Sequence, residues 1–529
     1  MRINLFYKLI TELRLIPFLV LTISCSKLSG RYGVNDNIIS KDEYRREIDA
    51  VAHISQEDFF GRILYALASR SDIKDNPLFF NGEDGNNIIH DAIMKNNIKL
   101  IETLLKNSEL SKTNSVLKVL EIKNSDGYTP LHLAVQHSKV EIIKLLFGYK
   151  NIKGNRININ IRDNNGLTPL HIASHDGYVD VVKELLHFHG INVNLRQNDG
   201  ITPLSVASQN GHVDVVKELL RFHGINVNLE DNNGITPLHI ASQDGHVDAV
   251  KELLHFDGID VNIKSTPGCT ALYFASQNGH VDVVKELLHF HGIDVNLRDN
   301  DNITPLYIAS QNGHVDVVKE LLHFDGIDVH LVDNDGLTPL HIASENGHAG
   351  IVSELHGIDV NLRDNDGFTS LHFASQYGHV DVVKELRNFH GIDVNLRDND
   401  NITPLYIASQ YGHVDVVKEL RNFHGIDVHL GDNDGLTPLH IASQNGHAGI
   451  VSELHGIDVN LRDNDGFTSL HIASQNGHVD VVKELLHFDG IDVNVTNYNN
   501  LTALDIAQRE GHAEIVKLLQ SYAAVNNLV

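Results

Sequence analysis

Apolar and polar positions recur along most of this chain in one fixed order, which residues 199–228 show clearly. Thr202 and Pro203 open a helix there, because a Thr hydroxyl accepts a hydrogen bond from a free N–H group and Pro suits the first helical position. Small and apolar residues at 204–207 follow. Gly211 then supplies a left-handed turn at low cost. The pattern predicts a short first helix that ends before Gly211.

A second helix is predicted from about residue 213. Its apolar residues Val213, Val216, Leu219 and Leu220 fall at i, i+3, i+6 and i+7, which is one face of a helix. A short extended stretch comes next, and a polar turn at 231–234 has residue types that favour tight turns. Each unit is therefore expected to consist of two helices and a finger that ends in a tight turn.

Two short helices and a finger cannot bury their apolar faces alone, so they must stack on further copies of themselves. Variants of the unit fill the chain from about Asp84 to its end, and the commonest period is thirty-four residues. We count thirteen units by the residue at the Thr202 position. These residues are Asn87, Thr129, Thr168, Thr202, Thr236, Thr270, Thr304, Thr338, Thr369, Thr403, Thr437, Thr468 and Thr502.

Two motifs identify the unit more closely. The first helix reads TPLHLA from Thr129 and TPLHIA from Thr168, and a Gly-His pair such as Gly245-His246 joins the two helices. With these motifs the chain resembles the ankyrin repeat family over roughly residues 82–522. The resemblance implies an α-solenoid of stacked ankyrin repeats, elongated and curved, in which each repeat is a helix-turn-helix with a β-hairpin-like finger.

Some units depart from the common length. The steps that begin at Thr338 and Thr437 are thirty-one residues each. Three residues, most of a helical turn, are missing from the end of the second helix. We therefore expect a local break in the smooth curvature near 353–357 and 452–456. The step after the first unit is longer instead, and its extra residues near 108–122 either extend the second helix or form a polar loop.

Residues 1–25 have the pattern of a targeting segment. Three basic residues accompany an apolar stretch at 15–23 that is too short to cross a bilayer as a helix. Ser24 and Cys25 then resemble the end of a bacterial lipoprotein signal, which implies that Cys25 carries the lipid. Thr22 departs from that signal, because Leu is usual at its position. The alternatives are an ordinary signal peptide or an uncleaved apolar start with an incidental Cys.

The rest of the chain divides by composition. Residues 26–39 lack periodicity and are expected to form a tether. Residues 40–81 begin with a capping box and are expected to form a helical N-terminal cap that covers the first repeat. The array occupies 82–522, and its last unit carries polar residues where a terminal cap requires them. Residues 523–529 are expected to form a short C-terminal tail.

Charge and cysteine content narrow the possible functions. The 42 Lys and Arg residues stand against 69 Asp and Glu residues, a net charge of −27. This charge argues against binding of nucleic acid or anionic lipid, and it favours basic partners. With Cys25 engaged, Cys269 leaves no disulfide framework, and its place before a first helix suits a small apolar residue. We expect a monomer that contacts a membrane only through a lipid anchor.

The 35 His residues invite a metal site, but most of them recur in phase at the TPLH and GH motifs. The resemblance implies that the TPLH His links neighbouring loops by hydrogen bonds. Pairs such as His187 and His189 lack a Cys or carboxylate ligand at metal spacing. The finger turn at 363–367 (RDNDG) lacks the ligand alternation of a calcium loop and suits a tight turn. Protonation of many His residues below about pH 6 would offset part of the negative charge.

Catalysis is not expected, because no catalytic motif stands in a suitable context and residues 26–80 are too few to house an active site. We expect no cofactor. The resemblance instead implies a protein partner bound on the concave surface, formed by finger tips and first-helix ends. The residues implied are Asn164, Asn165, Asn198, Asp199, Asn232 and Asn233 on the tips, and Gln209, Asn210, Tyr377 and Tyr411 at the helix ends.

These positions barely differ from unit to unit. Either the partner is itself extended or repetitive, or the surface has not diversified after recent duplication of the repeats. Three hypotheses follow. The chain is an exported or membrane-anchored bacterial scaffold that binds a protein, a host protein being one possibility, with secretion as the alternative to anchoring. The second hypothesis is a spacer with no selective partner. The third is an enzyme, which the small leftover length disfavours.

Overall fold

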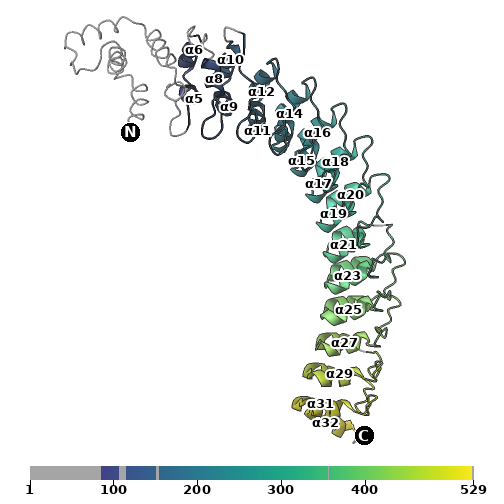
Figure 1. Cartoon of the computed structure of the whole chain (residues 1–529). Helices are drawn as coiled ribbons and strands as arrows, with labels where there is room; N and C mark the ends of the chain where they lie inside the picture. Colours follow the sequence, from purple (N-terminus) through teal and green to yellow (C-terminus); the bar gives the residue numbers. More distant parts are fainter. Residues whose placement is uncertain (1–84, 107–114, 151–153, 356, 455, 527–529) are drawn as a thin grey trace, which may run out of the picture. The chain divides into compact units, whose positions relative to one another are not determined.

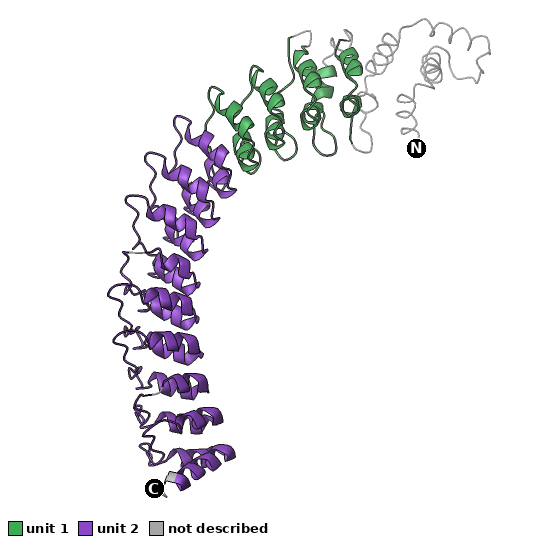
Figure 2. Cartoon of the chain, turned by 180° about the vertical axis from the view of Figure 1, so that it is seen from behind, with its two compact units in different colours: residues 1–232 green, residues 233–529 purple. Residues whose placement is uncertain are grey.

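The computed structural model describes residues 85–106, 115–150, 154–355, 357–454 and 456–526. The chain divides into two compact units, unit 1 (Met1–Asn232) and unit 2 (Asn233–Val529), coloured separately in Figure 2. The expected signal segment with Cys25, the tether and the N-terminal cap lie outside the described residues. In the described part of the chain, no helix combines the length and apolar character that a membrane span needs.

In the described part of the chain, thirteen helix pairs follow one another along the sequence, which matches the expected number of repeats. The pairs of unit 1 are α5 (Ile88–Met94) with α6 (Ile98–Lys106), α9 (Pro130–Gln136) with α10 (Val140–Gly148), α11 (Pro169–His175) with α12 (Val179–Leu186), and α13 (Pro203–Gln209) with α14 (Val213–Leu220). A separate helix, α8 (Ser115–Glu121), occupies part of the long step after the first unit, where the sequence suggested an extended second helix or a loop.

Unit 2 continues with nine further pairs (Figure 1). They are α15 (Pro237–Gln243) with α16 (Val247–Leu254), α17 (Ala271–Gln277) with α18 (Val281–Leu288), α19 (Pro305–Gln311) with α20 (Val315–Leu322), α21 (Pro339–Glu345) with α22 (Ala349–Val352), α23 (Ser370–Gln376) with α24 (Val380–Leu386), α25 (Pro404–Tyr411) with α26 (Val414–Leu420), α27 (Pro438–Gln444) with α28 (Ala448–Glu453), α29 (Ser469–Asn476) with α30 (Val479–Leu485), and α31 (Ala503–Glu510) with α32 (Ala513–Asn526). Helix α32 thus continues into the expected tail.

The local signals act as the sequence predicts at helix starts. Thr202 has an extended backbone (φ −99°, ψ 162°), and its side chain accepts a hydrogen bond from the Ser205 N–H group. In the second helix the buried residues are Val215, Val216 and Leu219. Val213 and Leu220 are only partly buried, so the buried stripe is rotated from the predicted one. Burial on both sides of the repeat, by the preceding and following pairs, accounts for the rotation.

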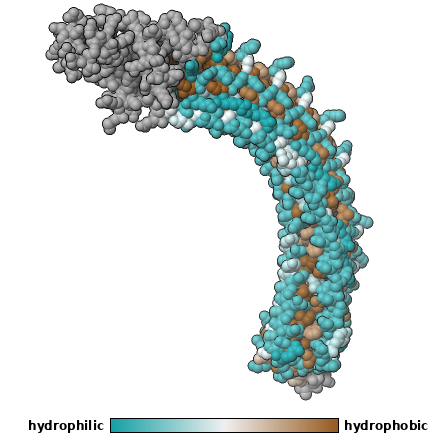
Figure 3. All heavy atoms as spheres, in the orientation of Figure 1, coloured by the Kyte–Doolittle hydropathy of each residue, from teal (hydrophilic) through white to brown (hydrophobic). Residues whose placement is uncertain are grey.

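Stacking builds the core. Within each unit every first helix contacts the first helix of the next repeat, and the second helices form a parallel layer. Side chains such as Leu306, Ala309 and Val317 are fully buried between these layers. Hydrophobic side chains on the face seen in Figure 3 gather in a band over the helices, between hydrophilic margins. Each unit is therefore an α-solenoid, which confirms the expected fold class.

The fingers are turns held by side chains. At one tip the Asp364 carboxylate accepts from the N–H groups of Asp366 (3.0 Å) and Phe368 (2.7 Å), and Gly367 has a φ of +86°. Three tips place Asn at the Gly position with a positive φ, namely Asn302, Asn401 and Asn500. The described fingers contain one isolated β-bridge, Thr496 with Thr502, so their hairpin character is slight.

The two short repeats have short second helices, as predicted. Helices α22 and α28 have 4 and 6 residues, against 8 in α20. Among the first helices and the fingers, the hydrogen bonds between successive repeats continue through the first short repeat. The Nε2 atom of His379 lies 2.9 Å from the carbonyl oxygen of Glu345, and the Asn365 N–H group donates to Asp335 O at 3.0 Å. The irregularity is thus confined to the second-helix side.

Candidate interaction surface

The TPLH histidines tie each first helix to the next finger. His341 accepts a hydrogen bond from the Thr338 N–H group at Nδ1 (3.1 Å), and its Nε2 lies 3.0 Å from the carbonyl oxygen of Leu362 in the next repeat. Nε2 must therefore carry the proton. Burial lowers the pKa of His341 to about 4. The same direction applies to His90, His132, His171, His372, His440 and His471.

These shifts limit the expectation that many His residues would be protonated below about pH 6, because they remove the buried TPLH histidines from that set. His341 stays neutral well below that pH, because the folded structure leaves no proton site at Nδ1 and removes the ring from water. Three repeats of unit 2 have Tyr at the same place, namely Tyr273, Tyr307 and Tyr406. The Tyr307 hydroxyl donates to Asp333 Oδ2 at 2.7 Å, and the Tyr406 hydroxyl donates to Asp432 Oδ2 at 2.8 Å.

The GH histidines form a second set of bonds between repeats. The Nε2 of His212 lies 2.8 Å from the carbonyl oxygen of His175, and the Nε2 of His280 lies 2.9 Å from that of Gln243. Both His sets thus hold the array together, as the resemblance implied for the TPLH set. Across the described ranges, no three His, Cys, Asp or Glu side chains gather as a metal site would need.

The Asn residues expected to contact a partner are exposed at the finger tips, but several bind the neighbouring finger. Asn232 Nδ2 donates to Asn198 O at 3.1 Å, and Asn198 Nδ2 donates to Asn164 O at 3.4 Å. The backbone carbonyl oxygens of Asn165 and Asp199 accept from the next finger as well. These tip residues are therefore exposed to solvent and also hold neighbouring fingers together. Asn233 is exposed in the same way, and its carbonyl oxygen accepts from Thr266.

The expected helix-end residues differ in kind. Gln209 and Asn210 are exposed at the end of α13, and Asn210 Nδ2 closes its own helix by donating to Val206 O at 2.9 Å. Tyr377 and Tyr411 are 47% and 53% exposed. They occupy the position at which neighbouring repeats carry Asn. All of the expected residues are therefore exposed at finger tips or first-helix ends, and the two tyrosines are the aromatic residues among them.

A row of finger-tip carboxylates was missed by the sequence reasoning, which explained the Asp-Asn-Asp turns by turn chemistry alone. That explanation holds for the first Asp of each turn, whose carboxylate accepts backbone N–H groups, as Asp299 does from Asp301 and Ile303. The second Asp is exposed and uses only its backbone in the turn. The signal available in the sequence was that each Asp-Asn-Asp triplet contains two Asp residues, of which the turn uses only the first carboxylate. The exposed members are Asp301, Asp335, Asp366, Asp400, Asp434 and Asp465.

The second helices carry ion pairs instead. Lys251 lies 3.6 Å from Glu286, Lys285 lies 3.5 Å from Glu320, and Arg387 pairs with Glu419. These pairs join successive repeats. Because most of them are exposed, each contributes little to stability.

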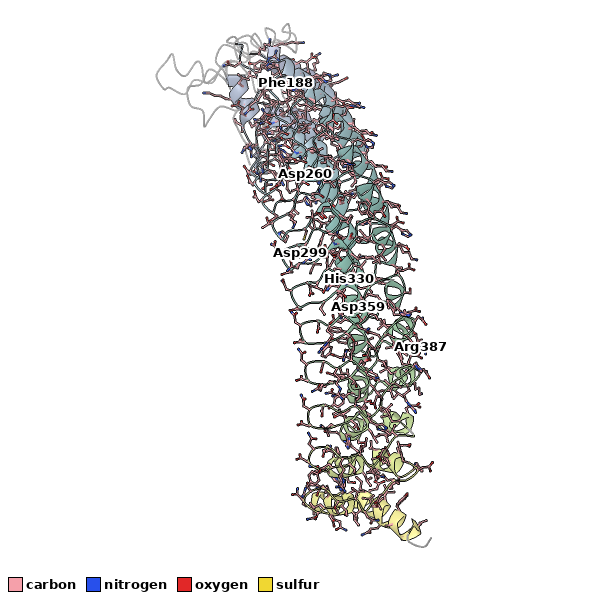
Figure 4. The ribbon with its side chains drawn as sticks, turned by 90° about the vertical axis from the view of Figure 1, so that its right-hand side faces the viewer. Phe188, Asp260, Asp299, His330, Asp359 and Arg387 are labelled. Carbon is pink, nitrogen blue, oxygen red and sulfur yellow. The ribbon has the colours of Figure 1, made fainter. Side chains whose placement is uncertain are left out.

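A cavity of about 450 Å³ lies beside the first short repeat. Its lining includes His330, Asp359 and Phe389. His330 stands where other repeats have an Asn that forms hydrogen bonds with the next loop. The Nε2 atom of His330 accepts a hydrogen bond from the Asp359 N–H group at 3.3 Å (Figure 4). The equivalent Asn296 donates to Gly326 O at 2.8 Å. The cavity borders the loop that follows α22, where the three residues are missing.

Cys269 lies in the core. It is 6% exposed and packs with Tyr273 and Ile308. Burial raises the pKa of its thiol to about 11, so the thiol stays protonated and unreactive at neutral pH. The interpretation of Cys269 as a small buried residue is confirmed.

Comparison with known families agrees with this geometry. A family model for ankyrin repeats (3 copies) matches the chain in seven overlapping places. The first match begins within the expected N-terminal cap. We found no match among curated proteins. The matched residues are 52–158, 89–197, 187–265, 258–333, 306–398, 388–463 and 447–528.

Proposed function

The chain belongs to the ankyrin repeat family, whose repeats generally serve as protein–protein interaction modules, and we propose that it is a non-enzymatic scaffold that binds a protein partner. The partner binds the concave surface formed by finger tips and first-helix ends. A host-cell protein is one class of partner in this proposal. The family is typically non-enzymatic, and the thiol of Cys269 is too deeply buried to act as a nucleophile.

The exposure of Tyr377 and Tyr411 is the observation that carries the proposal. Most finger-tip Asn residues have structural bonds that explain their presence. Tyr377 has one long bond of this kind, from its hydroxyl to Glu345 at 3.4 Å, and about half of each tyrosine side chain remains exposed to solvent. Tyr supplies a large amphipathic contact area and is enriched where proteins bind one another. The pair also breaks the uniformity of the array, as a selective surface must.

A spacer is the second candidate. It is favoured by the amide bonds between fingers, such as Asn232 to Asn198, which explain the repeated tips without any partner. A spacer needs no exposed aromatic pair, and this difference separates the two functions.

We further propose that the protein is exported and anchored to a bacterial membrane through a lipid on Cys25. Secretion without an anchor is the alternative. The support is the order of basic residues, short apolar stretch and Ser24-Cys25 in the sequence. Palmitate labelling of the full chain tests this part, since label that survives Cys25→Ala would contradict the anchor.

The scaffold is tested by affinity capture with the immobilised full chain over a range of partner concentrations. The double variant Tyr377→Ser and Tyr411→Ser should lose a saturable partner, and Tyr498→Ser should keep it. Tyr498 is a matched control because it is 67% exposed but lies at the last finger, outside the pair. Equal capture by all three proteins, or no saturable partner, would contradict the proposal and favour the spacer.

A further inference from the structure

Tyr377 and Tyr411 face solvent in consecutive repeats of unit 2. The other exposed large hydrophobic residues of the described ranges are Met94, Tyr498 and Val525, which lie in the terminal repeats. Each ring of the pair stacks on the His two residues later, with centroids 6.2 Å and 6.3 Å apart. The rings are held in place before a partner arrives, so binding costs them little conformational entropy.

Acidic finger tips accompany the pair along unit 2. Six consecutive turns read Asp-Asn-Asp, and with four preceding Arg against twelve Asp they carry a net charge of −8. The exposed carboxylate of each turn belongs to its second Asp, from Asp301 to Asp465. The ion pairs of the described ranges involve other carboxylates, chiefly those on the second helices. These six charges are therefore available to a partner.

The neighbouring arginines do not cancel this row. Arg363 donates from Nε to the carbonyl oxygen of Gly367 at 3.0 Å and from its terminal nitrogen to Asn399 Oδ1 at 3.2 Å. Its guanidinium is thus held by the finger backbone and an amide. No Arg–Asp ion pair forms at these tips in the described chain, and Arg is absent from the turns at Asp333 and Asp432.

The spacing of the row limits the shape of the partner. Adjacent fingers touch, because the Asn399 N–H group donates to Asp366 O at 3.1 Å, and packed helices lie about 10 Å apart. One exposed carboxylate therefore recurs about every 10 Å. A polyproline II segment rises about 3.1 Å per residue with three residues per turn, so every third side chain lies on one face at about 9 Å intervals. An α-helix with one charge per turn repeats at about 5.4 Å, and to match the row it would carry only one basic residue in every seven.

We propose that this part of unit 2 docks an extended basic segment of the partner, with Lys or Arg at every third residue, an inference that rests on the function proposed above. The basic side chains pair with the tip carboxylates of Asp366, Asp400 and their neighbours. The segment's remaining residues pack against Tyr377 and Tyr411, which lie at the C-terminal ends of the first helices that follow these tips. Aromatic rings bind polyproline II segments in this manner because such segments are already ordered.

The test uses the full chain and a fluorescein-labelled peptide of seven Arg-Pro-Pro triplets, followed by fluorescence anisotropy. Saturable binding is expected. The variant Tyr377→Ser with Tyr411→Ser should weaken it about tenfold or more, as loss of aromatic anchors does. The variant Asp366→Asn with Asp400→Asn should weaken it several-fold and reduce its salt dependence. These Asp side chains bond nothing in the turn, so the fold should survive their replacement.

Three controls define the result. Asp325→Asn removes an exposed carboxylate that follows α20, away from the finger tips and first-helix ends, and should change nothing. A peptide of the same composition with its arginines gathered at one end should bind more weakly, because its charges miss the spacing. The proposal of a basic segment would be contradicted if the peptide did not bind. It would also be contradicted if binding changed neither with the Asp variants nor with the spacing of the arginines in the peptide. If a neutral Tyr-Pro peptide then binds and responds to the Tyr variants, the proposed scaffold function still stands.

Discussion

The Nε2 atom of His314 lies 3.0 Å from the carbonyl oxygen of Gln277, which precedes it by 37 residues. Gly279 makes this approach possible, since a Cβ atom there would lie 2.6 Å from His314 Nδ1. The same pairing of Gly and His recurs along both units, for example between Gly177 and His212. Where the GH motif is present, successive repeats are thus joined by a hydrogen bond that requires the Gly of one repeat and the His of the next.

Replacement of Gly279 by Ala should therefore destabilise unit 2 by more than its backbone strain alone. Gly279 has a φ of +73°, which costs an Ala residue about 1–2 kcal/mol, and the clash with His314 adds to that cost. Gly292 is the matched control, because its φ is +93° and nothing lies within 4 Å of an added Cβ. Urea midpoints for the two variants provide the measurement. Equal losses would show that the ring contact is unimportant.

Acidification should unfold the array through its buried histidines. The folded pKa of His341 is about 4, below the value of 6.5 expected when unfolded, so the folded state binds fewer protons. Its stabilisation is complete above pH 6.5 and is lost progressively as the pH falls toward 4, by up to about 3 kcal/mol. Urea midpoints between pH 7 and pH 4 should fall steeply.

The variant His341→Tyr isolates this effect. Tyr307 occupies the equivalent place one repeat earlier and bonds to a finger carboxylate, and Asp364 stands in the equivalent position for a Tyr at 341. The variant should fold at neutral pH and lose less stability on acidification than the unchanged protein. A pH dependence identical to that of the unchanged protein would contradict the assignment to His341.

Two equivalent serines should respond oppositely to replacement by Ala. The Ser310 hydroxyl donates to Leu306 O at 2.8 Å, whereas the buried Ser344 hydroxyl has no hydrogen-bond partner in the described structure. Ser310→Ala should lower the free energy of unfolding by about 1 kcal/mol, and Ser344→Ala should leave it unchanged or raise it. Denaturant titration of both variants compares them directly. A larger loss for Ser344→Ala would show that its hydroxyl is bonded in solution.

Much of the fold can be predicted from the sequence because the same local signals recur in many repeats. Thr202 and Pro203 mark a helix start, and the three residues missing after Ser353 shorten α22 as expected. The sequence misplaced Val213, because a stripe derived from one helix ignores the neighbours that cover Val215. It also left α8 unassigned, where the spacing of the repeat gave no guide.

The surface was less predictable than the core. Residue type indicated that Asn198 and Asn232 face solvent, but only the placement of adjacent fingers shows that their amides bond across the gap. Likewise, the two Asp residues of one turn look alike in sequence. Asp364 is used by its own backbone and Asp366 is not, because only the first lies where the turn presents N–H groups.

Photo-crosslinking at position 411 tests the central claim most directly. Tyr411 is replaced by p-benzoylphenylalanine in the full chain, and the same residue is placed at position 498 as the control. We expect a covalent adduct with the partner from position 411, suppressed by excess Arg-Pro-Pro peptide, and none from position 498. Adducts of equal yield from both positions, or none from position 411 while a partner is bound, would contradict recognition at the tyrosine pair.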